Sequence, residues 1–299
     1  MRIPDSIMTS FLADNLSQVN DKIGQLQLQT ASGKRINKPS DDPSGMSQAL
    51  NMKSGLARID QFQKSASNAQ LWMKSEDVAL SNVQDMIRQA RTIALQAANP
   101  MSDAAREPLA ENISASRESM VQIANTSIGT RFIFGGFKTD SKLFTTTGAA
   151  VSYNGDDGKI SNAIGEGISV QINHTGNEVF NMDSSDPSTP DLFSTFNQLS
   201  DAIKANDQTK IQSLIGTLDK FGTKINSLRA ENGQRLQQVQ LGIDHLDQSK
   251  ITTTKLLSDT EDADISETLV HLKEQENVLQ ATSYVTSTLS KASLLNWLR

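Results

Sequence analysis

The sequence of 299 residues contains no cysteine, and prolines and aromatic residues are few. The lack of cysteine excludes disulfides, thiol nucleophiles and cysteine-ligated metal sites, and it fits both a cytosolic protein and a protein exported unfolded. No run of about eighteen apolar residues occurs, so the sequence predicts no transmembrane helix. The first residues lack the apolar core of a secretory signal, and we expect no ordinary cleaved leader.

The sequence also lacks an excess of positive charge. It has 28 lysines and arginines against 34 aspartates and glutamates, for a net charge of -6. A protein that binds nucleic acid electrostatically is typically basic over its binding domain. We therefore expect no nucleic-acid partner, and for lack of an apolar span we expect no insertion into a membrane.

Glycine and proline are unevenly distributed along the chain. They are rare across most of the first 130 residues and again after Asp191, and they gather in residues 129–190. Because these residues interrupt regular helices, this distribution predicts two helix-rich flanks around a centre of different structure.

Apolar residues recur in steps of three and four along both flanks, the spacing of coiled-coil helices. We interpret the seams nearest the two chain ends as an assembly interface. Its residues are Leu12, Leu16, Val19, Ile23, Leu26, Ile265, Leu269, Leu272, Leu279, Val285, Leu289 and Leu295. These terminal segments are otherwise polar, so helices there are marginal when isolated and are expected to fold as they assemble.

A longer seam runs from Ile59 to Ala97, and only Glu76 interrupts it. Residues 44–98 predict one helix of about 80 Å, at a rise of about 1.5 Å per residue. The pair Asn99-Pro100 is expected to end it, because proline disfavours helix at the preceding residue. We interpret Glu76 as a polar residue that sets the register of the packed helices.

The central region carries short strand patterns. Residues 151–153 predict a strand that runs into a tight turn at residues 154–158. Residues 168–172 alternate apolar and polar residues, as in a half-buried strand. Residues 183–191 read as a polar linker that leads back into helix.

The predicted fold class is mainly α, with a long coiled-coil-like helical rod built from both chain ends and an inserted small β-rich domain. An ordinary helical bundle is the alternative. We expect terminal coiled-coil segments at residues 1–45 and 256–299 and a long-helix rod at 46–134 and 191–255. The β-rich domain with its linker is expected at 135–190.

No residue pattern indicates an enzyme or a cofactor site. The three histidines, His174, His245 and His271, have no second ligand at metal-binding spacing, and no phosphate-binding loop or nucleophile elbow occurs. The acidic run at residues 259–264 is better explained as the start of the last helix, where negative charge is favourable. We therefore expect no catalytic residues, no cofactor and no metal.

The link between the first two helices is unusually specific. Gly33 is suited to cap the first helix, and the carboxylates and hydroxyls at residues 40–42 can accept hydrogen bonds from the first amides of the next helix. We interpret the segment as an inter-domain link. Its residues are Gly33, Arg35, Asn37, Pro39, Asp41, Asp42, Pro43 and Gly45.

This link resembles the N-terminal signature of the bacterial flagellin superfamily. The matching residues are Ser-Gly-Lys-Arg-Ile-Asn at 32–37 and Pro-Ser-Asp-Asp-Pro at 39–43. Residues 258–267 and 280–282 are similar to the C-terminal signature, so the resemblance covers roughly the first 130 and the last 100 residues. The opening Met1-Arg2-Ile3 and residues 131–136 and 293–298 are more similar to the hook–filament junction branch than to flagellin. Trp297 stands where that branch often has another aromatic residue.

The resemblance implies a structural protein of the bacterial flagellum that joins hook to filament. It implies that the terminal helices form an antiparallel coiled-coil inner tube, are unfolded in the free monomer, and fold on assembly. The β-rich domain would face outward. The chain would be cytoplasmic until secreted unfolded by the flagellar type III apparatus, and would then lie at the hook–filament junction. The link at residues 33–45 is expected to absorb strain between hook and filament.

The resemblance also implies partners. They are the first hook-associated protein, flagellin, further copies of the same chain in a ring, and a cytoplasmic export chaperone. The chaperone would bind the apolar stripe of the last helix, at Val278, Ala281, Val285 and Leu289. Two alternatives are a flagellin filament subunit and a helical signalling or adhesin-like secreted protein.

Overall fold

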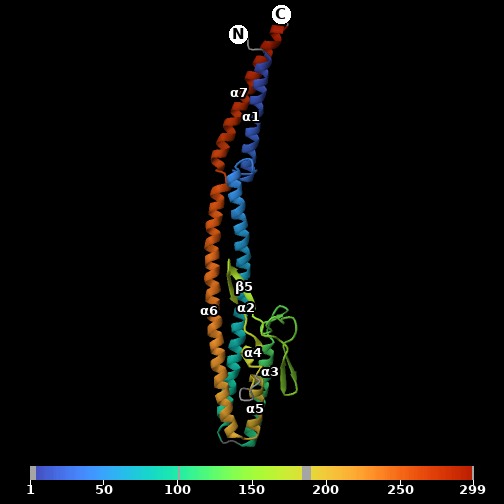
Figure 1. Cartoon of the computed structure of the whole chain (residues 1–299), viewed down its shortest axis with the longest axis vertical. Helices are drawn as coiled ribbons and strands as arrows, with labels where there is room; N and C mark the ends of the chain where they lie inside the picture. Colours follow the sequence, from blue (N-terminus) through green and yellow to red (C-terminus); the bar gives the residue numbers. More distant parts are fainter. Residues whose placement is uncertain (1–4, 100–101, 184–189, 298–299) are drawn as a thin grey trace. The chain divides into compact units, whose positions relative to one another are not determined.

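The computed structural model describes residues 5–99, 102–183 and 190–297 (Figure 1). The chain divides into two units. The terminal unit comprises Met1–Arg58 and Ser249–Arg299, and the central unit comprises Ile59–Gln248. No helix in the described ranges is long and apolar enough to span a membrane. The predicted opening Met1-Arg2-Ile3 lies outside the described residues.

Seven helices and six short strands are assigned in the described residues. The helices are α1 (Asp5–Ser32), α2 (Pro43–Ala97), α3 (Asp103–Ala124), α4 (Gly176–Phe180), α5 (Leu192–Lys204), α6 (Gln208–Glu261) and α7 (Ile265–Trp297). The strands are β1 (Ser127–Ile128), β2 (Arg131–Phe132), β3 (Phe144–Thr147), β4 (Ala150–Tyr153), β5 (Ser161–Gly165) and β6 (Ile168–Gln171). The prediction of one long helix ended by Asn99-Pro100 is confirmed, since α2 ends at Ala97.

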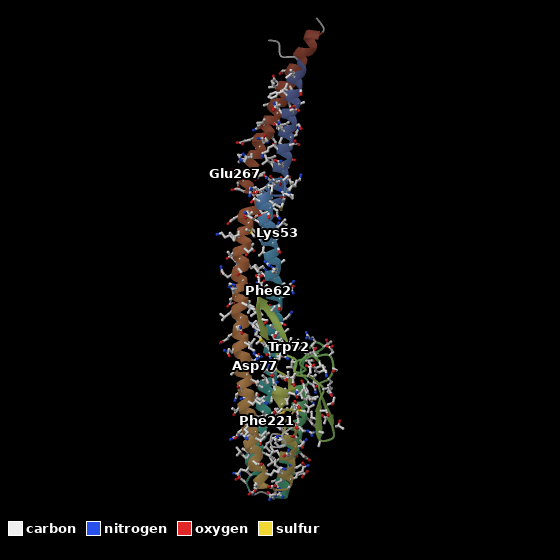
Figure 2. The ribbon with its side chains drawn as sticks, viewed as in Figure 1. Lys53, Phe62, Trp72, Asp77, Phe221 and Glu267 are labelled. Carbon is white, nitrogen blue, oxygen red and sulfur yellow. The ribbon has the colours of Figure 1, made fainter. Side chains whose placement is uncertain are left out.

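In the central unit, the seam predicted on α2 is the buried face of that helix. Its members from Met73 through Leu80, Val83 and Ile87 are almost wholly inaccessible to solvent. They share one hydrophobic core with Leu218, Phe221 and Ile225 of α6, and the buried Trp72 of α2 belongs to the same core (Figure 2). Burial of an apolar side chain of this size is worth about 1.5–3 kcal/mol, so the seam is a main source of stability for this unit.

Polar side chains form a regular ladder beside this core. The hydrogen-bonded pairs between α2 and α6 are Gln63–Asp247 at 2.5 Å, Gln70–Gln240 at 2.9 Å, Gln84–Asn226 at 2.6 Å and Arg91–Asp219 at 2.6 Å. The partners follow one another in steps of seven on both helices, with one double step between Gln70 and Gln84. The same register puts Gly233 opposite Asp77, and Arg229, one turn away, supplies the ion pair with Asp77 instead, at 3.0 Å.

A cluster of aromatic rings holds the β-rich insert to the helices of the central unit. Phe180 of α4 stacks on Phe193 of α5 with ring centroids 5.1 Å apart. It also makes edge contacts with Phe144 of β3 at 5.1 Å and with Phe134 at 5.7 Å. All four side chains are almost completely buried. Such aromatic pairs each contribute about 0.5–1.5 kcal/mol beyond their buried area.

The strands form three separate two-stranded antiparallel sheets, β1–β2, β3–β4 and β5–β6. The prediction of a tight turn at residues 154–158 is wrong, because β4 pairs backward with β3 and the hairpin closes between Thr147 and Ala150. The segment after β4 is instead an open loop held by Asp156, whose carboxylate accepts hydrogen bonds from the amides of Phe137 at 2.7 Å and Gly158 at 2.9 Å. Phe137 lies 19 residues before Asp156, so the turn-like residues at 154–158 do not reveal this contact.

The predicted fold class is confirmed. The described chain is mainly helical, with α1 paired with α7, α2 paired with α6, and a small β-rich insert between α3 and α5 (Figure 1).

Candidate assembly interface

In the terminal unit, α1 and α7 lie side by side in opposite directions (Figure 1). The seam predicted on α1 lies on the face of this helix that is least exposed to solvent. Leu12, Leu16 and Val19 are half-buried, and Ile23 and Leu26 are buried. The packing of α1 therefore tightens toward the loop that follows it.

The seam residues of α7 divide into two groups. Leu272 and Leu279 are half-buried on the face toward α1, next to the buried Thr268. Ile265, Leu269 and Val285 are 39–47 % exposed. Leu289 and Leu295 lie among the side chains that the structure does not describe.

A shallow apolar groove of about 580 Å³ runs between the two helices. Leu12 and Val19 of α1 and Val278, Ala281 and Val285 of α7 line it. The rest of its lining is polar, from Asn15, Gln18, Gln275 and Thr282. A strip of apolar residues between two paired helices is suited to accept a third helix. Three of the four residues predicted to bind a chaperone, Val278, Ala281 and Val285, lie in this groove.

Glu261, the last residue of α6, is a buried carboxylate at the centre of the terminal unit. Its side chain pairs with the ammonium groups of Lys34 and of Lys53, the latter at 2.5 Å. Its backbone oxygen accepts a hydrogen bond from the amide of Arg35 at 2.7 Å, and the guanidinium of Arg35 donates to the carbonyl of Thr260 at 2.8 Å. Burial alone would raise the pKa of Glu261, but the two lysines outweigh it and hold that pKa below its ordinary value.

Gly33 sits in the left-handed region, with φ of 72°, immediately after α1. This is the helix-capping role predicted for it. Its carbonyl accepts a hydrogen bond from the amide of Ala263 at 3.0 Å. The backbones of Lys34 and Asp262 are paired in an isolated antiparallel β-bridge. The link after α1 is thus joined by backbone hydrogen bonds to the segment between α6 and α7.

Two carboxylates organise the rest of the link. Asp42 accepts a hydrogen bond from the amide of Gly45 at 2.9 Å and so caps α2, which begins with proline at its first position. Asp41 accepts hydrogen bonds from the amides of Asn37 at 3.0 Å and Lys38 at 2.8 Å. These backbone hydrogen bonds lower the pKa of Asp41. The prediction that these residues accept hydrogen bonds from the first amides of the next helix is confirmed for Asp42, but it is wrong for Asp41, whose carboxylate binds amides of the link before it.

Gly45 is required by the close packing of the link. A Cβ atom there would lie 2.5 Å from a carboxylate oxygen of Asp42 and 2.6 Å from Cδ1 of the buried Ile36. We expect Gly45→Ala to displace the cap and to lower the free energy of unfolding of the terminal unit by about 1–3 kcal/mol, the usual range for overpacking. Urea unfolding of the assembled form, or proteolysis at the link, measures the change.

Gly55→Ala is the matched control for this prediction. Gly55 lies on the same helix, and a Cβ there would meet nothing within 4 Å. Alanine at this position is expected to stabilise the helix by about 0.5–1 kcal/mol. Equal behaviour of the two variants would contradict the role assigned to Gly45.

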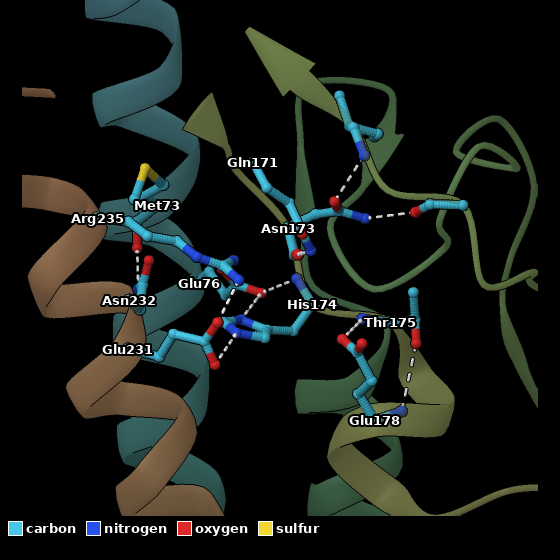
Figure 3. A network of polar contacts seen from close by, with 12 residues as sticks. Met73, Glu76, Gln171, Asn173, His174, Thr175, Glu178, Glu231, Asn232 and Arg235 are labelled. Atoms are coloured by element: carbon cyan, nitrogen blue, oxygen red, sulfur yellow. Dashed lines mark hydrogen bonds and ion pairs between the residues drawn. The ribbon is translucent and has the colours of Figure 1, made fainter. Parts of the chain in front are cut away.

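The central unit contains a buried pair of titratable side chains that the sequence did not bring together (Figure 3). Glu76 of α2 is fully buried, and one of its carboxylate oxygens accepts a hydrogen bond from the backbone amide of His174 at 2.6 Å. The same oxygen lies 3.1 Å from Nδ1 of the His174 ring, which is also buried. The interruption of the seam at Glu76 was a visible signal, but its partner lies 98 residues away.

No group of three or more potential ligands able to hold a metal ion is found in the part of the chain that the structure describes. The residues of the candidate interface offer apolar surface, backbone hydrogen bonds and ion pairs. This arrangement suits helix packing and assembly.

Comparisons with known proteins agree with this picture. Residues 3–139 match the model of the bacterial flagellin N-terminal helical region. The chain is 29 % identical to flagellar hook-associated protein 3 of Escherichia coli, over 85 % of this chain and 86 % of that protein. It is 28 % identical to flagellar hook-associated protein 3 of Salmonella typhimurium, over 96 % of each. Flagellin of Listeria monocytogenes is 24 % identical, over 98 % of this chain and 96 % of that protein.

Solved structures share the fold. A putative flagellar hook-associated protein from Vibrio parahaemolyticus superposes with a TM-score of 0.68 at 21 % identity, covering 74 % of this chain and all of that chain. A flagellar junction protein from Legionella pneumophila gives a TM-score of 0.59 at 17 % identity, covering 73 % of this chain and all of that chain.

By these comparisons the chain resembles the flagellin family of structural proteins of the bacterial flagellum, with the N-terminal family region matched over residues 3–139 and curated relatives matched over most of the chain. Within that family it is similar, over most of its length, to flagellar hook-associated protein 3. The resemblance inferred from the link and the C-terminal signature is confirmed.

Proposed function

We propose that this protein is the adaptor that joins the flagellar hook to the flagellin filament, by folding and assembly of its terminal helices. The observation that carries the proposal is the apolar surface left on α7 and in the groove between α1 and α7, including Ile265, Leu269 and Val285. An extended apolar surface of this kind marks a site of contact with other proteins. Neighbouring helices in the flagellum would cover it.

The similarity to hook-associated protein 3 over nearly the whole chain supports this position in the flagellum. The partners we propose are the first hook-associated protein on the hook side, flagellin on the filament side, and further copies of this chain in a ring. Before export, a cytoplasmic chaperone would cover Val278, Ala281 and Val285, which lie in the groove.

Deletion of the gene tests the proposal. We expect the mutant cells to carry bare hooks under the electron microscope and to lose flagellin monomers to the culture medium, because nothing would hold the first filament subunits. Expression of the intact chain from a plasmid should restore filaments. Normal filaments in the deletion strain would overturn the proposal.

A second candidate function is that of a bulk filament subunit, which the similarity to Listeria flagellin favours. Abundance separates the two. A filament subunit would make up most of the protein mass of purified filaments, whereas an adaptor would be a minor component found with the hook.

A further inference from the structure

The pair Glu76–His174 joins two segments of the central unit that are otherwise distinct. Glu76 lies in the middle of the long helix α2, and His174 lies in the short connection between β6 and α4. The whole connection is buried, including Asn173 and Thr175. Buried polar groups in proteins are nearly always hydrogen-bonded, so the partners of this connection decide what it is attached to.

The neighbours of His174 hold the connection to the insert itself. The side chain of Asn173 accepts a hydrogen bond from the amide of Ile160 at 2.8 Å and donates to the carbonyl of Gly158 at 2.9 Å. Thr175 and Glu178 form a reciprocal capping box at the start of α4. His174 differs from them, because its hydrogen bond to Glu76 and its contact with Glu231 reach the long helices α2 and α6 (Figure 3).

Each element around the pair contributes a charged group. Glu231 of α6 places a carboxylate oxygen 3.7 Å from Nε2 of His174, and Arg235 of the same helix pairs with Glu231. Glu178 of α4 also acts on His174 through its charge. Glu76 and His174 are buried and Glu231 is half exposed. The side chain of Arg235 is only 18 % exposed, and its positive charge acts on both members of the pair.

We propose that Glu76 and His174 form a latch that fixes the β-rich insert to α2 through one shared proton, and that the insert is released when this proton is lost. With one proton, the pair is neutral overall, either as two neutral groups or as carboxylate and imidazolium. Without it, the buried carboxylate of Glu76 lies beside a neutral imidazole, and the positive charge of Arg235 offsets its burial only in part. An unpaired buried charge is strongly destabilising, and detachment of the insert would let water reach it.

The direction of the pH dependence follows from the two groups. Burial raises the pKa of Glu76, with His174 opposing the rise. Burial alone would lower the pKa of His174, but Glu76 outweighs it and the pKa of His174 lies above its ordinary value. In solvent, glutamate and histidine release their protons near pH 4.3 and 6.5, about the values of model peptides. The latched form therefore binds more protons than the released form at neutral pH, and attachment weakens as the pH rises.

Hydrogen exchange of the intact protein at several pH values tests the latch. After division by the intrinsic exchange rate, the opening constant of residues 168–180 is expected to rise by up to roughly tenfold per pH unit above about pH 6.5, because one proton is released on opening. Amides of α2 and α6 in the core, at residues 80–87 and 218–225, are expected to change much less. A flat profile for the insert, or equal slopes in insert and helices, would overturn the proposal.

Two histidine variants make the test specific. His174→Gln removes the titrating ring and is expected to abolish the slope at residues 168–180. His245→Gln removes an exposed histidine from α6 and is expected to leave the slope unchanged. A wild-type slope in the His174→Gln variant would contradict the latch.

A measurement on the unaltered chain tests the latch even if the His174→Gln variant fails to fold. The imidazole of His174 can be titrated by nuclear magnetic resonance, and it is expected to lose its proton above about pH 6.5, over the same range in which the insert opens. Titration of His174 at or below the model-peptide value would overturn the proposal.

Discussion

Phe180→Ala is expected to lower the free energy of unfolding of the central unit by about 3–5 kcal/mol, the usual cost of removing a buried phenylalanine. The effect is large because the Phe180 ring contacts Phe134, Phe144 and Phe193, which come from three different segments. Its removal leaves a cavity between the insert and α5. Urea unfolding followed by the fluorescence of the buried Trp72 measures the change.

Phe137→Ala is the matched control. Phe137 belongs to the same insert, but its side chain is 69 % exposed. Loss of an exposed ring is expected to change the free energy of unfolding by no more than about 0.5 kcal/mol. If Phe180→Ala were as mild as Phe137→Ala, the aromatic cluster would not be what holds the insert in place.

Leu26→Asp is expected to abolish attachment of the filament. Leu26 is buried on the face of α1 toward α7, and a carboxylate there would be removed from water without a partner, at a cost of several kcal/mol. Because folding of the terminal helices is coupled to assembly in the proposed function, the loss of their pairing prevents incorporation. Electron microscopy of the deletion strain that expresses this variant should show bare hooks.

The control for this substitution is Gln27→Asp, which adds the same charge at the next, exposed position of α1. It should restore filaments in the deletion strain. Normal filaments with Leu26→Asp, or bare hooks with both variants, would contradict the assignment of the buried α1 face to helix pairing. Comparable export of both variants into the medium shows that secretion is intact.

The long helices could be predicted from the sequence because their cause is local and repeated. The seam from Ile59 to Ala97 places an apolar residue at every third or fourth position, and Asn99-Pro100 marks its end. The capping roles of Gly33 and Asp42 were predictable for the same reason, since each acts on backbone within a few residues.

Contacts between distant residues could not be predicted in this way. The sequence singles out Glu76 as an interruption, but its spacing carries no information about His174 or Glu231. The interpretation of the acidic run at residues 259–264 as a helix start is correct only for its last residue, since Asp264 accepts hydrogen bonds from the amides of Ser266 and Glu267, whereas residues 259–261 are the end of α6. It did not indicate that Glu261 pairs with Lys34 and Lys53, because that pairing depends on the return of α6 to the link.

On α7 the apolar spacing did not indicate which of the seam residues pack on α1. Leu272 and Leu279 turn toward α1, whereas Leu269 and Val285 remain exposed. A helix with apolar residues on more than one face has contacts with more than one neighbour. This is the surface on which the proposed assembly depends.

The position of the protein in the flagellum is the most direct test of the account. Flagella isolated with their hooks can be labelled with gold-conjugated antibodies raised against this chain and viewed by electron microscopy. If the protein is the proposed adaptor, the label is confined to the boundary between hook and filament. Label along the whole filament would identify a bulk filament subunit instead. Flagella without any label would show that the protein is not a component of the assembled flagellum.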